Sequence, residues 1–369
     1  MTFDLAALRR WPDLEGPDLP AADAADRLIL DESAPARSEA DPGTISAIGD
    51  GYGALTLGAA SDGGRGIRVH IDAFTGEQAL AANAERLGGA DAFTTRALTP
   101  EVVRDARVVL LRLPRSLDAL RDIAGLIAAA ASPEVVVYAG GRLKHMTPAM
   151  NDVLRERFDR VDVTHARQKS RVLIARGPHD GGVPSPRSEQ HDGLVVCAFG
   201  GAFAGTSIDI GTRFLLEHLP AVAPGAGAVI DLACGTGIVA TTLALRNAGL
   251  RVYATDQSAA AVASARATAE ANGVADRVDV VRGDLLRDLP DDTGRFIALN
   301  PPFHVGGAVT EGIAPRMFAD AARVLSAGGE LWTVWNSALH YRPVLERLVG
   351  PTRQVARNAK FTVTASTKR

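Results

Sequence analysis

Two halves of the chain carry the same succession of sequence features, and this repeat constrains the fold more than any single motif. In each half, apolar segments of strand length alternate with helical segments, as in an open, mostly parallel sheet with helices on both faces. Matching features recur at an offset of roughly 184 to 190 residues. A repeat of this length indicates a duplicated folding unit. We therefore expect two tandem Rossmann-like α/β domains.

The matching segments share position but not chemistry. Asp72 follows Gly53 at the same spacing as Asp256 follows Gly237. The other pairs are Gly51-Tyr52-Gly53 with Gly235-Thr236-Gly237, Arg112-Leu113-Pro114 with Asn300-Pro301-Pro302, and Ala166–Lys169 with Ala356–Ala359. The first half has no Asn-Pro-Pro-Phe sequence, and no Asp-x-x-Cys precedes its glycine turn. We therefore expect the first domain to be a degenerate copy of the second.

Length and composition set the domain boundaries. A chain of 369 residues exceeds one ordinary domain, and its 46% hydrophobic and 22% charged content is typical of a soluble globular protein. Residues 177–193 are dense in Gly, Pro and charge, without apolar periodicity, which favours a linker. The expected domains are therefore residues 1–176 and 194–369.

Cysteine usage and hydropathy exclude several classes of protein. The only cysteines, Cys197 and Cys234, form neither a metal-ligand spacing nor a disulfide framework, so we expect no metal and a reducing compartment. No apolar run approaches the roughly 18 residues of a membrane span. Residues 1–11 lack the basic and apolar regions of a signal peptide. We expect a cytoplasmic protein, and a monomer, with no membrane contact.

The segment from Asp231 to Gly237 links an apolar strand to a helix. Its glycines permit positive φ and let a ligand lie close to the backbone. The spacing Gly235-x-Gly237-x-x-Ala240 also satisfies a dinucleotide-binding pattern, so a nicotinamide-dependent oxidoreductase stays an alternative. Asp231 favours S-adenosylmethionine instead, since an acid here neutralises an amino group, directly or through water, but repels a pyrophosphate.

Two further acids follow the next two strands. Asp256 is placed to accept both ribose hydroxyls, and Asp284 to accept the adenine amino group. Ligands of open α/β sheets bind at the carboxyl ends of the strands, so these acids belong to one rim. We also expect their neighbours in sequence, Ala233, Gln257 and Leu285, to line the cofactor pocket.

The stretch Asn300-Pro301-Pro302-Phe303 follows the apolar strand Phe296–Leu299. Two prolines fix φ, remove two backbone donors and stiffen the segment. The Asn300 amide oxygen and the Pro301 carbonyl can accept hydrogen bonds from an exocyclic amine while the Phe303 ring stacks on its plane. Asn300 is thus expected beside the methyl donor, and the four residues are our candidate catalytic set.

The distribution of charge along the chain points to a polyanionic partner. The net charge is only −3, but residues 140–176 carry 9 Lys/Arg against 4 acids and residues 341–369 carry 7 against 1. Basic faces of this kind attract phosphate, although they also occur as ordinary solvated surfaces.

These motifs together resemble the class I S-adenosylmethionine-dependent methyltransferases, and more closely the two-domain ribosomal RNA guanine-N2 methyltransferases. The resemblance spans nearly the whole chain. It rests on Gly201–Phe203, Asp209–Thr212, Asn300–Gly306 and Ala356–Phe361 in the second half, and on Leu19–Asp26, Leu113–Ser116 and Lys144-His145 in the first. It implies that the second domain binds cofactor and guanine, and that the first binds RNA or supports folding.

The resemblance also implies further site residues. Phe203, Asp209 and Thr212 would line the cofactor pocket from its amino-terminal side. His304 would face the target base or a phosphate, and Arg357 and Lys360 would contact the substrate. The expected substrate is a flipped guanine in 16S or 23S ribosomal RNA, free or within a ribosomal subunit.

Two alternatives share parts of this pattern. A methyltransferase acting on a protein glutamine amide uses the same tetrapeptide, although the duplicated first half disfavours it. A non-catalytic RNA-binding or assembly factor would need neither Asn300 nor the acids. Cofactor binding and the location of transferred label distinguish the three.

Overall fold

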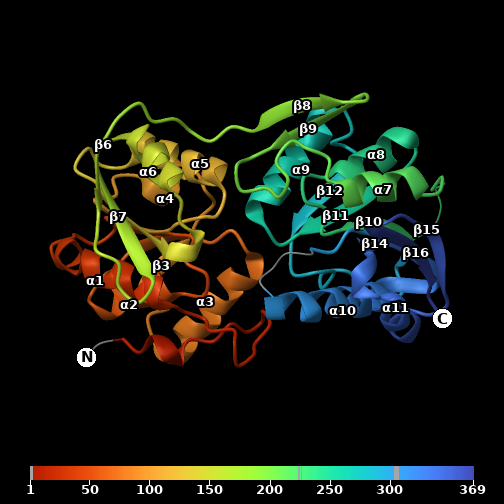
Figure 1. The fold of residues 1–369 in the computed structure, drawn as a ribbon, viewed down its shortest axis with the longest axis horizontal. Coiled ribbons are helices and arrows are strands. Elements are labelled where there is room, and N and C mark those ends of the chain that lie inside the picture. The colour runs from red at the N-terminus through yellow and green to blue at the C-terminus, as the bar shows by residue number, and fades with distance from the viewer. Residues whose placement is uncertain (1–2, 223–224, 226, 303–306) are drawn as a thin grey trace. The chain divides into compact units, whose positions relative to one another are not determined.

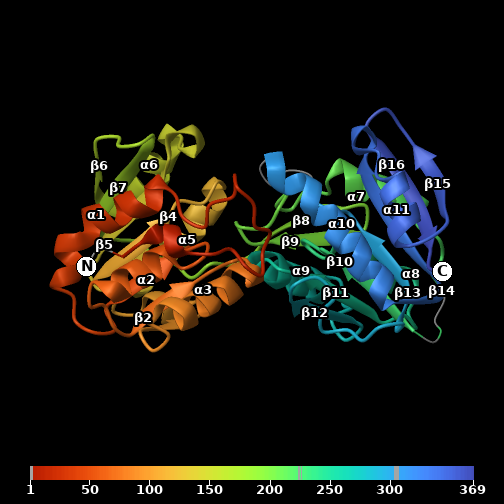
Figure 2. The same cartoon turned by 90° about the horizontal axis from the view of Figure 1, so that it is seen from below.

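The structure, a computed structural model, describes residues 3–222, 225, 227–302 and 307–369, and the side chains of all of these except 307–311. The chain divides into two compact units, Met1–Ser185 and Pro186–Arg369. Each unit holds one large sheet covered by helices (Figures 1 and 2). We describe each unit by itself.

The N-terminal unit is a seven-stranded sheet with helices between its strands. Its elements are η1 (Leu5–Ala7), α1 (Ala24–Ser38), β1 (Ile45–Ile48), α2 (Ala54–Ser61), β2 (Ile67–His70), α3 (Phe74–Leu87), β3 (Phe93–Thr95), α4 (Pro100–Val103), β4 (Val108–Arg112), α5 (Leu117–Ala130), β5 (Val136–Arg142), η2 (Leu143–His145), α6 (Pro148–Arg155), β6 (Phe158–Val163) and β7 (Ser170–Pro178).

The C-terminal unit begins with a hairpin and continues with a second seven-stranded sheet. Its elements are β8 (Arg187–His191), β9 (Leu194–Ala198), α7 (Ile210–His218), β10 (Ala228–Leu232), α8 (Ile238–Arg246), β11 (Val252–Asp256), α9 (Ala259–Ala271), β12 (Val278–Arg282), β13 (Gly294–Leu299), α10 (Gly307–Val324), β14 (Leu325–Asn336), η3 (Ser337–Leu339), α11 (Arg342–Leu348), β15 (Thr352–Arg357) and β16 (Phe361–Thr367).

The two sheets have the same topology, which confirms the predicted pair of tandem Rossmann-like domains. The strand orders are β3-β2-β1-β4-β5-β7-β6 and β12-β11-β10-β13-β14-β16-β15. In each sheet the first five strands are parallel and the last two pair antiparallel with their neighbours. The matched glycines also take the same position, since Gly53 is the N-cap of α2 and Gly237 the N-cap of α8, both in the left-handed region.

Strand β13 shows why the central strands are almost wholly apolar. Phe296 and Ala298 belong to the core on one face of the sheet, while Ile297 and Leu299 belong to the core on the other. Successive side chains of a strand point to opposite faces, so a strand covered by helices on both sides needs a continuous apolar run. The polar residue that follows, Asn300, therefore marks the rim of the sheet.

The expected linker over residues 177–193 requires a correction. Gly177 and Pro178 end β7, and Arg187–His191 forms β8, which pairs antiparallel with β9. Asp192 and Gly193 close this hairpin with φ of 43° and 88°. A two-residue turn with positive φ at both positions favours Asp-Gly. This dipeptide indicates a hairpin, whereas the Gly, Pro and charge content of the whole stretch favoured a linker.

Strand β9 is held by a row of polar side chains on α9. The backbone N–H groups of Val195, Cys197 and Phe199 each donate to a side-chain oxygen at 3.0 Å. The acceptors are Asn272, just past the end of α9, and Thr268 and Ser264 within it. Because residues four apart lie on one face of a helix, this spacing matches the two-residue repeat of the strand.

Other boundaries differ from the sequence expectation in small ways. Met150–Phe158 would be one helix by periodicity, but α6 ends at Arg155 and Phe158 begins β6. Both cysteines are free and buried, as expected. Among the described residues, no helix is both long and apolar enough to cross a membrane.

Candidate active site

The turn after β10 combines three backbone positions that favour glycine or small residues. Ala233, Gly235 and Gly237 have φ of 57°, 55° and 75°. A Cβ on Gly237 would lie 2.8 Å from the Cβ of Ala265, so glycine lets α8 pack closely against α9. A Cβ on Gly235 would have no atom within 4 Å. The backbone of Gly235 therefore borders open space where a ligand can approach.

Asp256, at the end of β11, shapes this turn. One carboxylate oxygen accepts from the backbone N–H of Gly235 at 3.0 Å, and the other accepts from that of Ser258 at 2.9 Å. These two bonds hold the carboxylate against the glycine turn, at the end of β11. Gln257, the next residue, is exposed. The structure thus brings together Gly235 and Asp256, as the sequence indicated.

Asp284 and Leu285 follow β12 at the same edge of the sheet. Asp284 is 7% exposed, and the Arg287 guanidinium lies 3.0 Å from its Oδ2. Leu285 has a φ of 59°, and its carbonyl accepts from the Thr255 hydroxyl at 3.4 Å. Because β10, β11 and β12 are parallel, their carboxyl ends place this pair in line with the glycine turn and Asp256.

Asp231 occupies a more interior position than a direct ligand contact requires. Its side chain is 3% exposed, and Oδ2 accepts from the backbone N–H of Ala240 in the first turn of α8. Burial raises the pKa of Asp231 to about 7; the Ala240 hydrogen bond opposes the rise and the charge of Asp256 adds to it. Of the two routes that the sequence left open, this placement favours contact through water.

Asn300 follows β13 and is anchored by residues from α7. Its Nδ2 donates to Asp209 Oδ2 at 3.1 Å and to Thr212 Oγ1 at 2.9 Å. Asp209 is the N-cap of α7, accepting from the backbone N–H groups of Gly211 and Thr212. The sequence expectation placed Asp209 and Thr212 in the cofactor pocket. Their side chains hold the Asn300 amide.

This anchoring fixes which end of the Asn300 amide faces the site. A carboxylate only accepts hydrogen bonds, so the NH2 end must point toward Asp209. Oδ1 is buried, and no donor reaches it from the part of the chain that the structure describes. A buried acceptor without a donor costs about 1 to 3 kcal/mol and is uncommon in proteins. Among the described residues, Oδ1 of Asn300 is therefore a buried acceptor without a donor.

The other candidate catalytic residues lie at the limit of the described chain. Pro301 is buried and Pro302 is partly buried. Phe303 and His304 lie outside the described residues.

The rim beside Asn300 includes the turn between β15 and β16. A Cβ on Gly211 would lie 3.4 Å from both Asn300 Oδ1 and the Phe361 ring, so these groups border one narrow space. The Lys360 Nζ lies 5.5 Å from the centroid of that ring. Arg357 is exposed at the end of β15. Sequence reasoning missed the role of Gly211, whose signal was a glycine inside the first turn of a helix.

Phe203 lies in the segment between β9 and α7. The same segment reaches the start of α9, since a Cβ on Gly201 would lie 2.9 Å from the Cβ of Ala260. Phe203 is 71% exposed and Ile210 61%. Exposed apolar side chains at this end of the sheet are suited to cover a bound ligand.

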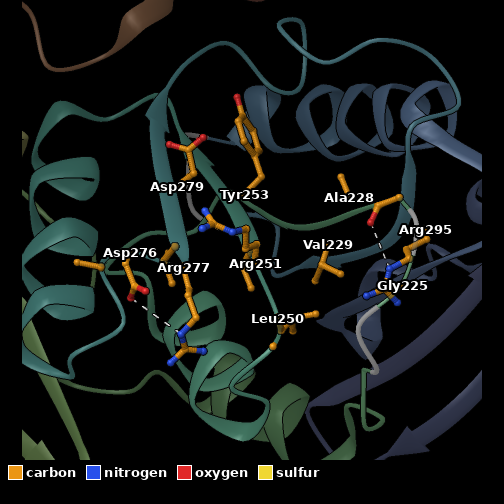
Figure 3. Close-up of a pocket in the computed structure, with 15 residues that line it drawn as sticks. Gly225, Ala228, Val229, Leu250, Arg251, Tyr253, Asp276, Arg277, Asp279 and Arg295 are labelled. Carbon is orange, nitrogen blue, oxygen red and sulfur yellow. Dashed lines mark hydrogen bonds and ion pairs between the residues drawn. The ribbon is translucent and has the colours of Figure 1, made fainter.

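A cavity of about 680 Å³ lies at the opposite end of the same sheet from Asn300 (Figure 3). Its lining includes the starts of β10, β11 and β12, together with Arg251, Arg277 and Arg295. Arg277 donates to the carbonyls of Ala244 and Asn247, and Arg295 to that of Gly227. Arg277 and Arg295 therefore hydrogen-bond to backbone carbonyls at the end of α8 and before β10. Both lie at the amino ends of the strands, away from the rim that carries Asn300.

A Rossmann-like sheet with a glycine turn, acids after successive strands and an oriented amide at its rim defines an S-adenosylmethionine-dependent methyltransferase. Residues 193–365 match the methyltransferase small domain family, and residues 1–179 match the RLMG N-terminal domain family. The chain belongs to the ribosomal RNA large subunit methyltransferase G family.

Relatives with that name match the chain along nearly its whole length. The Streptomyces avermitilis protein is 35% identical, with 98% of this chain and 97% of the relative covered. The Shewanella amazonensis protein is 31% identical over 98% of this chain and 96% of the relative. A T. thermophilus 16S ribosomal RNA N2-guanine methyltransferase, solved with S-adenosylmethionine and guanosine, shares the fold, with a TM-score of 0.76, 22% identity and 94% and 92% coverage of the two chains.

Within the described residues, no group of three or more His, Cys, Asp or Glu side chains is arranged to hold a metal ion.

Proposed function

We propose that this enzyme transfers the methyl group of S-adenosylmethionine to the exocyclic N2 amine of a guanine in large-subunit ribosomal RNA. The observation that carries the proposal is Asn300, whose NH2 end is held by Asp209 and Thr212 while its buried Oδ1 has no donor among the described residues. Guanine N2 is an amine with two hydrogens on a flat ring, which is the group such an acceptor fits.

The cofactor fits the glycine turn and the acids beside it. Gly235 leaves open space against its backbone, and the Asp256 carboxylate lies beside it, where it would accept from the ribose hydroxyls. Asp284 and Leu285 would border the adenine of the cofactor. The positive φ of Ala233 and the hydrogen bond from Ala240 to Asp231 stabilise the turn. When bound, S-adenosylmethionine supplies a methyl group on a positively charged sulfur.

The residues around Asn300 orient the amine rather than deprotonate it. An aryl amine is a weak nucleophile because its lone pair is conjugated with the ring. Hydrogen bonds from its two hydrogens to Asn300 Oδ1 and the Pro301 carbonyl favour a pyramidal nitrogen whose lone pair points at the methyl carbon. As the N–C bond forms, the S–C bond breaks with its electrons passing to sulfur, and the nitrogen loses one proton to water. Positioning supplies most of the rate enhancement.

The substrate class is supported by the family. Its members named above are methyltransferases of the ribosomal large subunit, and the structurally similar T. thermophilus enzyme methylates guanine N2. Lys360 and Arg357 place positive charge at the rim beside Asn300, where an RNA phosphate would pass. Phe303 and His304 complete the proposed base contacts. We also propose that the enzyme is a monomer and that it acts in the cytoplasm.

Methyl transfer to undermodified ribosomal particles tests the proposal. Large and small subunits from a strain lacking this enzyme are incubated with methyl-labelled S-adenosylmethionine, and the RNA is digested to nucleosides. We expect labelled N2-methylguanosine from the large subunit. Naked large-subunit RNA, run in parallel, distinguishes free RNA from the assembled particle as substrate.

The same incubation separates the alternatives. Label recovered in protein, with none in RNA, would establish the glutamine methyltransferase alternative and refute the proposal. RNA binding without any calorimetric binding of S-adenosylmethionine would identify a non-catalytic factor.

A further inference from the structure

The degenerate N-terminal unit retains the anchoring scheme of the active site with a different side chain in it. Arg112 ends β4, as Asn300 follows β13, and each comes directly after the last leucine paired with the central strand. Arg112 donates to both carboxylate oxygens of Asp23, at 2.8 and 2.7 Å, and to Asp26 at 3.0 Å. Asp23 and Asp26 are the N-cap and third residue of α1, as Asp209 and Thr212 are of α7.

A small basic pocket surrounds this position. It has a volume of about 270 Å³, and its walls come from the segments that follow β4 and β5. The lining residues are Asp23, Arg112, Leu113, Arg115, Gly141, Arg142, Lys144, His145 and Met146. Ligands of open α/β sheets bind at this edge, so the pocket is the counterpart of the place where the C-terminal unit would hold its target base.

Positive charge exceeds negative charge in this pocket. The Asp23 carboxylate is already engaged bidentately by Arg112. Among the described residues, no carboxylate lies within ion-pair distance of Arg115 or Lys144. Partial burial and the nearby charges of Arg115, Lys144, Arg112 and Arg142 lower the pKa of His145. Arg142 lies 3.8 Å from Asp23 and Arg112 3.0 Å from Asp26. The four cations of the pocket therefore face two carboxylates, and neither carboxylate pairs with Arg115 or Lys144.

The size and lining of the pocket favour a backbone phosphate over a base. Small-molecule pockets commonly occupy roughly 300 to 1,000 Å³, so this one is at or below the lower end. No lining residue is Phe, Tyr or Trp, so a base would lack a stacking platform. Guanidinium groups match the geometry of phosphate oxygens. Several lining residues also belong to the start of residues 142–176, a stretch in which Lys and Arg outnumber acids.

We propose that the former active site of the N-terminal unit is a phosphate-binding pocket that holds a phosphodiester group of the RNA substrate through Arg115, Arg142 and Lys144. Arg112 has a structural role in this pocket, because its hydrogen bonds to Asp23 and Asp26 hold the end of β4 against the start of α1. The pocket binds the RNA strand without reading its sequence, because phosphate contacts fix position and carry no base information.

Affinity for RNA as a function of salt tests this pocket. The full-length double variant Arg115→Ala/Lys144→Ala is compared with wild type by anisotropy of a labelled single-stranded oligoribonucleotide. Both substituted side chains are exposed, outside the Arg112 network. We expect the Kd to rise about tenfold at low salt. The slope of log Kd against log salt should fall by about 0.7 for each phosphate that the variant no longer neutralises.

A matched control removes the same charge elsewhere on the unit. Arg104→Ala/Arg155→Ala deletes two arginines that are 59% and 55% exposed and outside the pocket, each in a surface ion pair of small energetic weight. We expect its Kd and salt slope to match wild type. If the two double variants show equal losses, the effect is net charge alone and the pocket proposal is wrong.

Two further measurements test whether the pocket acts on RNA and not on a free anion. The charge-reversed Arg115→Glu/Lys144→Glu should weaken RNA binding beyond the alanine variant while S-adenosylmethionine binds as in wild type. Saturable binding of inorganic phosphate that Arg115→Ala/Lys144→Ala abolishes, with unchanged RNA affinity, would assign the pocket to a free anion and overturn the proposal. None of these readouts requires methyl transfer, so the pocket can stand or fall independently of the guanine-N2 activity.

Discussion

In the proposed mechanism, Asn300 combines two roles that are usually given to different residues. Its NH2 group is bonded to the N-cap and first turn of α7. Its buried Oδ1, which has no donor among the described residues, is the proposed acceptor for the substrate amine. The anchor comes from Asp209, which is 91 residues away in sequence. A side chain fixed by two hydrogen bonds loses its rotamer freedom before substrate arrives, which reduces the entropy cost of orienting the amine.

Thr212→Val tests whether Thr212 positions Asn300 or lines the cofactor pocket. The substitution keeps the shape of the side chain and removes the acceptor at 2.9 Å from Asn300 Nδ2. Loss of one hydrogen bond of about 1 to 1.5 kcal/mol should lower kcat about tenfold. The Kd for S-adenosylmethionine should stay unchanged. A raised Kd with unchanged kcat would return Thr212 to the cofactor pocket.

Asp231 should make cofactor binding depend on pH near neutrality. Burial raises its folded pKa to about 7, above the unfolded value near 3.9, so protonation favours the folded state and this contribution to stability declines from about pH 4 to 7. The neutral carboxyl present below pH 7 cannot attract the cofactor's ammonium group. Calorimetry between pH 6 and 8 should show the Kd falling as pH rises, and Asp231→Asn should flatten the profile.

At the scale of elements, the row of side chains on α9 determines where the segment carrying Phe203 begins. Ser264, Thr268 and Asn272 hold the backbone of β9 up to Phe199, four residues before Phe203. The hairpin adds a second restraint, since His191 contacts the Thr206 carbonyl at 2.8 Å. The cover of the proposed cofactor site is thus supported by polar contacts from both sides.

Thr268→Val should weaken this support. The buried N–H of Cys197 loses its acceptor, and the Cys197 carbonyl loses the Thr268 hydroxyl at 3.2 Å. We expect a loss of about 1 to 3 kcal/mol in unfolding free energy and a weaker Kd for S-adenosylmethionine. Glu270→Gln, on the exposed side of the same helix, is the control and should change neither. An unchanged unfolding midpoint in Thr268→Val would contradict the role given to the row.

The sequence was most informative where burial on two faces imposes apolar runs. The strand before Asn300 was predicted within two residues because it packs between helices. It was least informative for β8 and β15, whose exposed, charged strands carry no such run. The acids and Asn300 could be placed on one rim from strand ends alone. The contact of Asn300 with Asp209 could not be predicted, because a long-range side-chain contact leaves no local pattern in the sequence.

At the scale of the whole molecule, duplication has produced two units whose glycine turns have different side-chain surroundings. Tyr52 stands in the turn of the N-terminal unit, its hydroxyl donating to Asp13 at 2.6 Å and the Arg10 guanidinium 4.6 Å from its ring. Asn83 also bonds the Tyr52 carbonyl at 2.9 Å. Residues of the segment before α1 thus pack on Tyr52, which stands where the C-terminal unit has Thr236.

One chain should therefore bind one molecule of S-adenosylmethionine. Calorimetric titration of the full chain should give a stoichiometry of about one. Asp256→Ala should abolish binding, because it removes the acceptor of Gly235 and the proposed ribose contact. A stoichiometry of two, or a site that survives Asp256→Ala, would show that the N-terminal unit also binds the cofactor.

The most direct test of the account is single-turnover methyl transfer by Asn300→Ala on undermodified large subunits, with N2-methylguanosine counted by mass spectrometry. Removing Oδ1 takes away the acceptor that orients the amine, so the rate should fall by about 10² to 10³ while the Kd for S-adenosylmethionine stays at the wild-type value. Formation of N2-methylguanosine at the wild-type rate by Asn300→Ala would contradict the account.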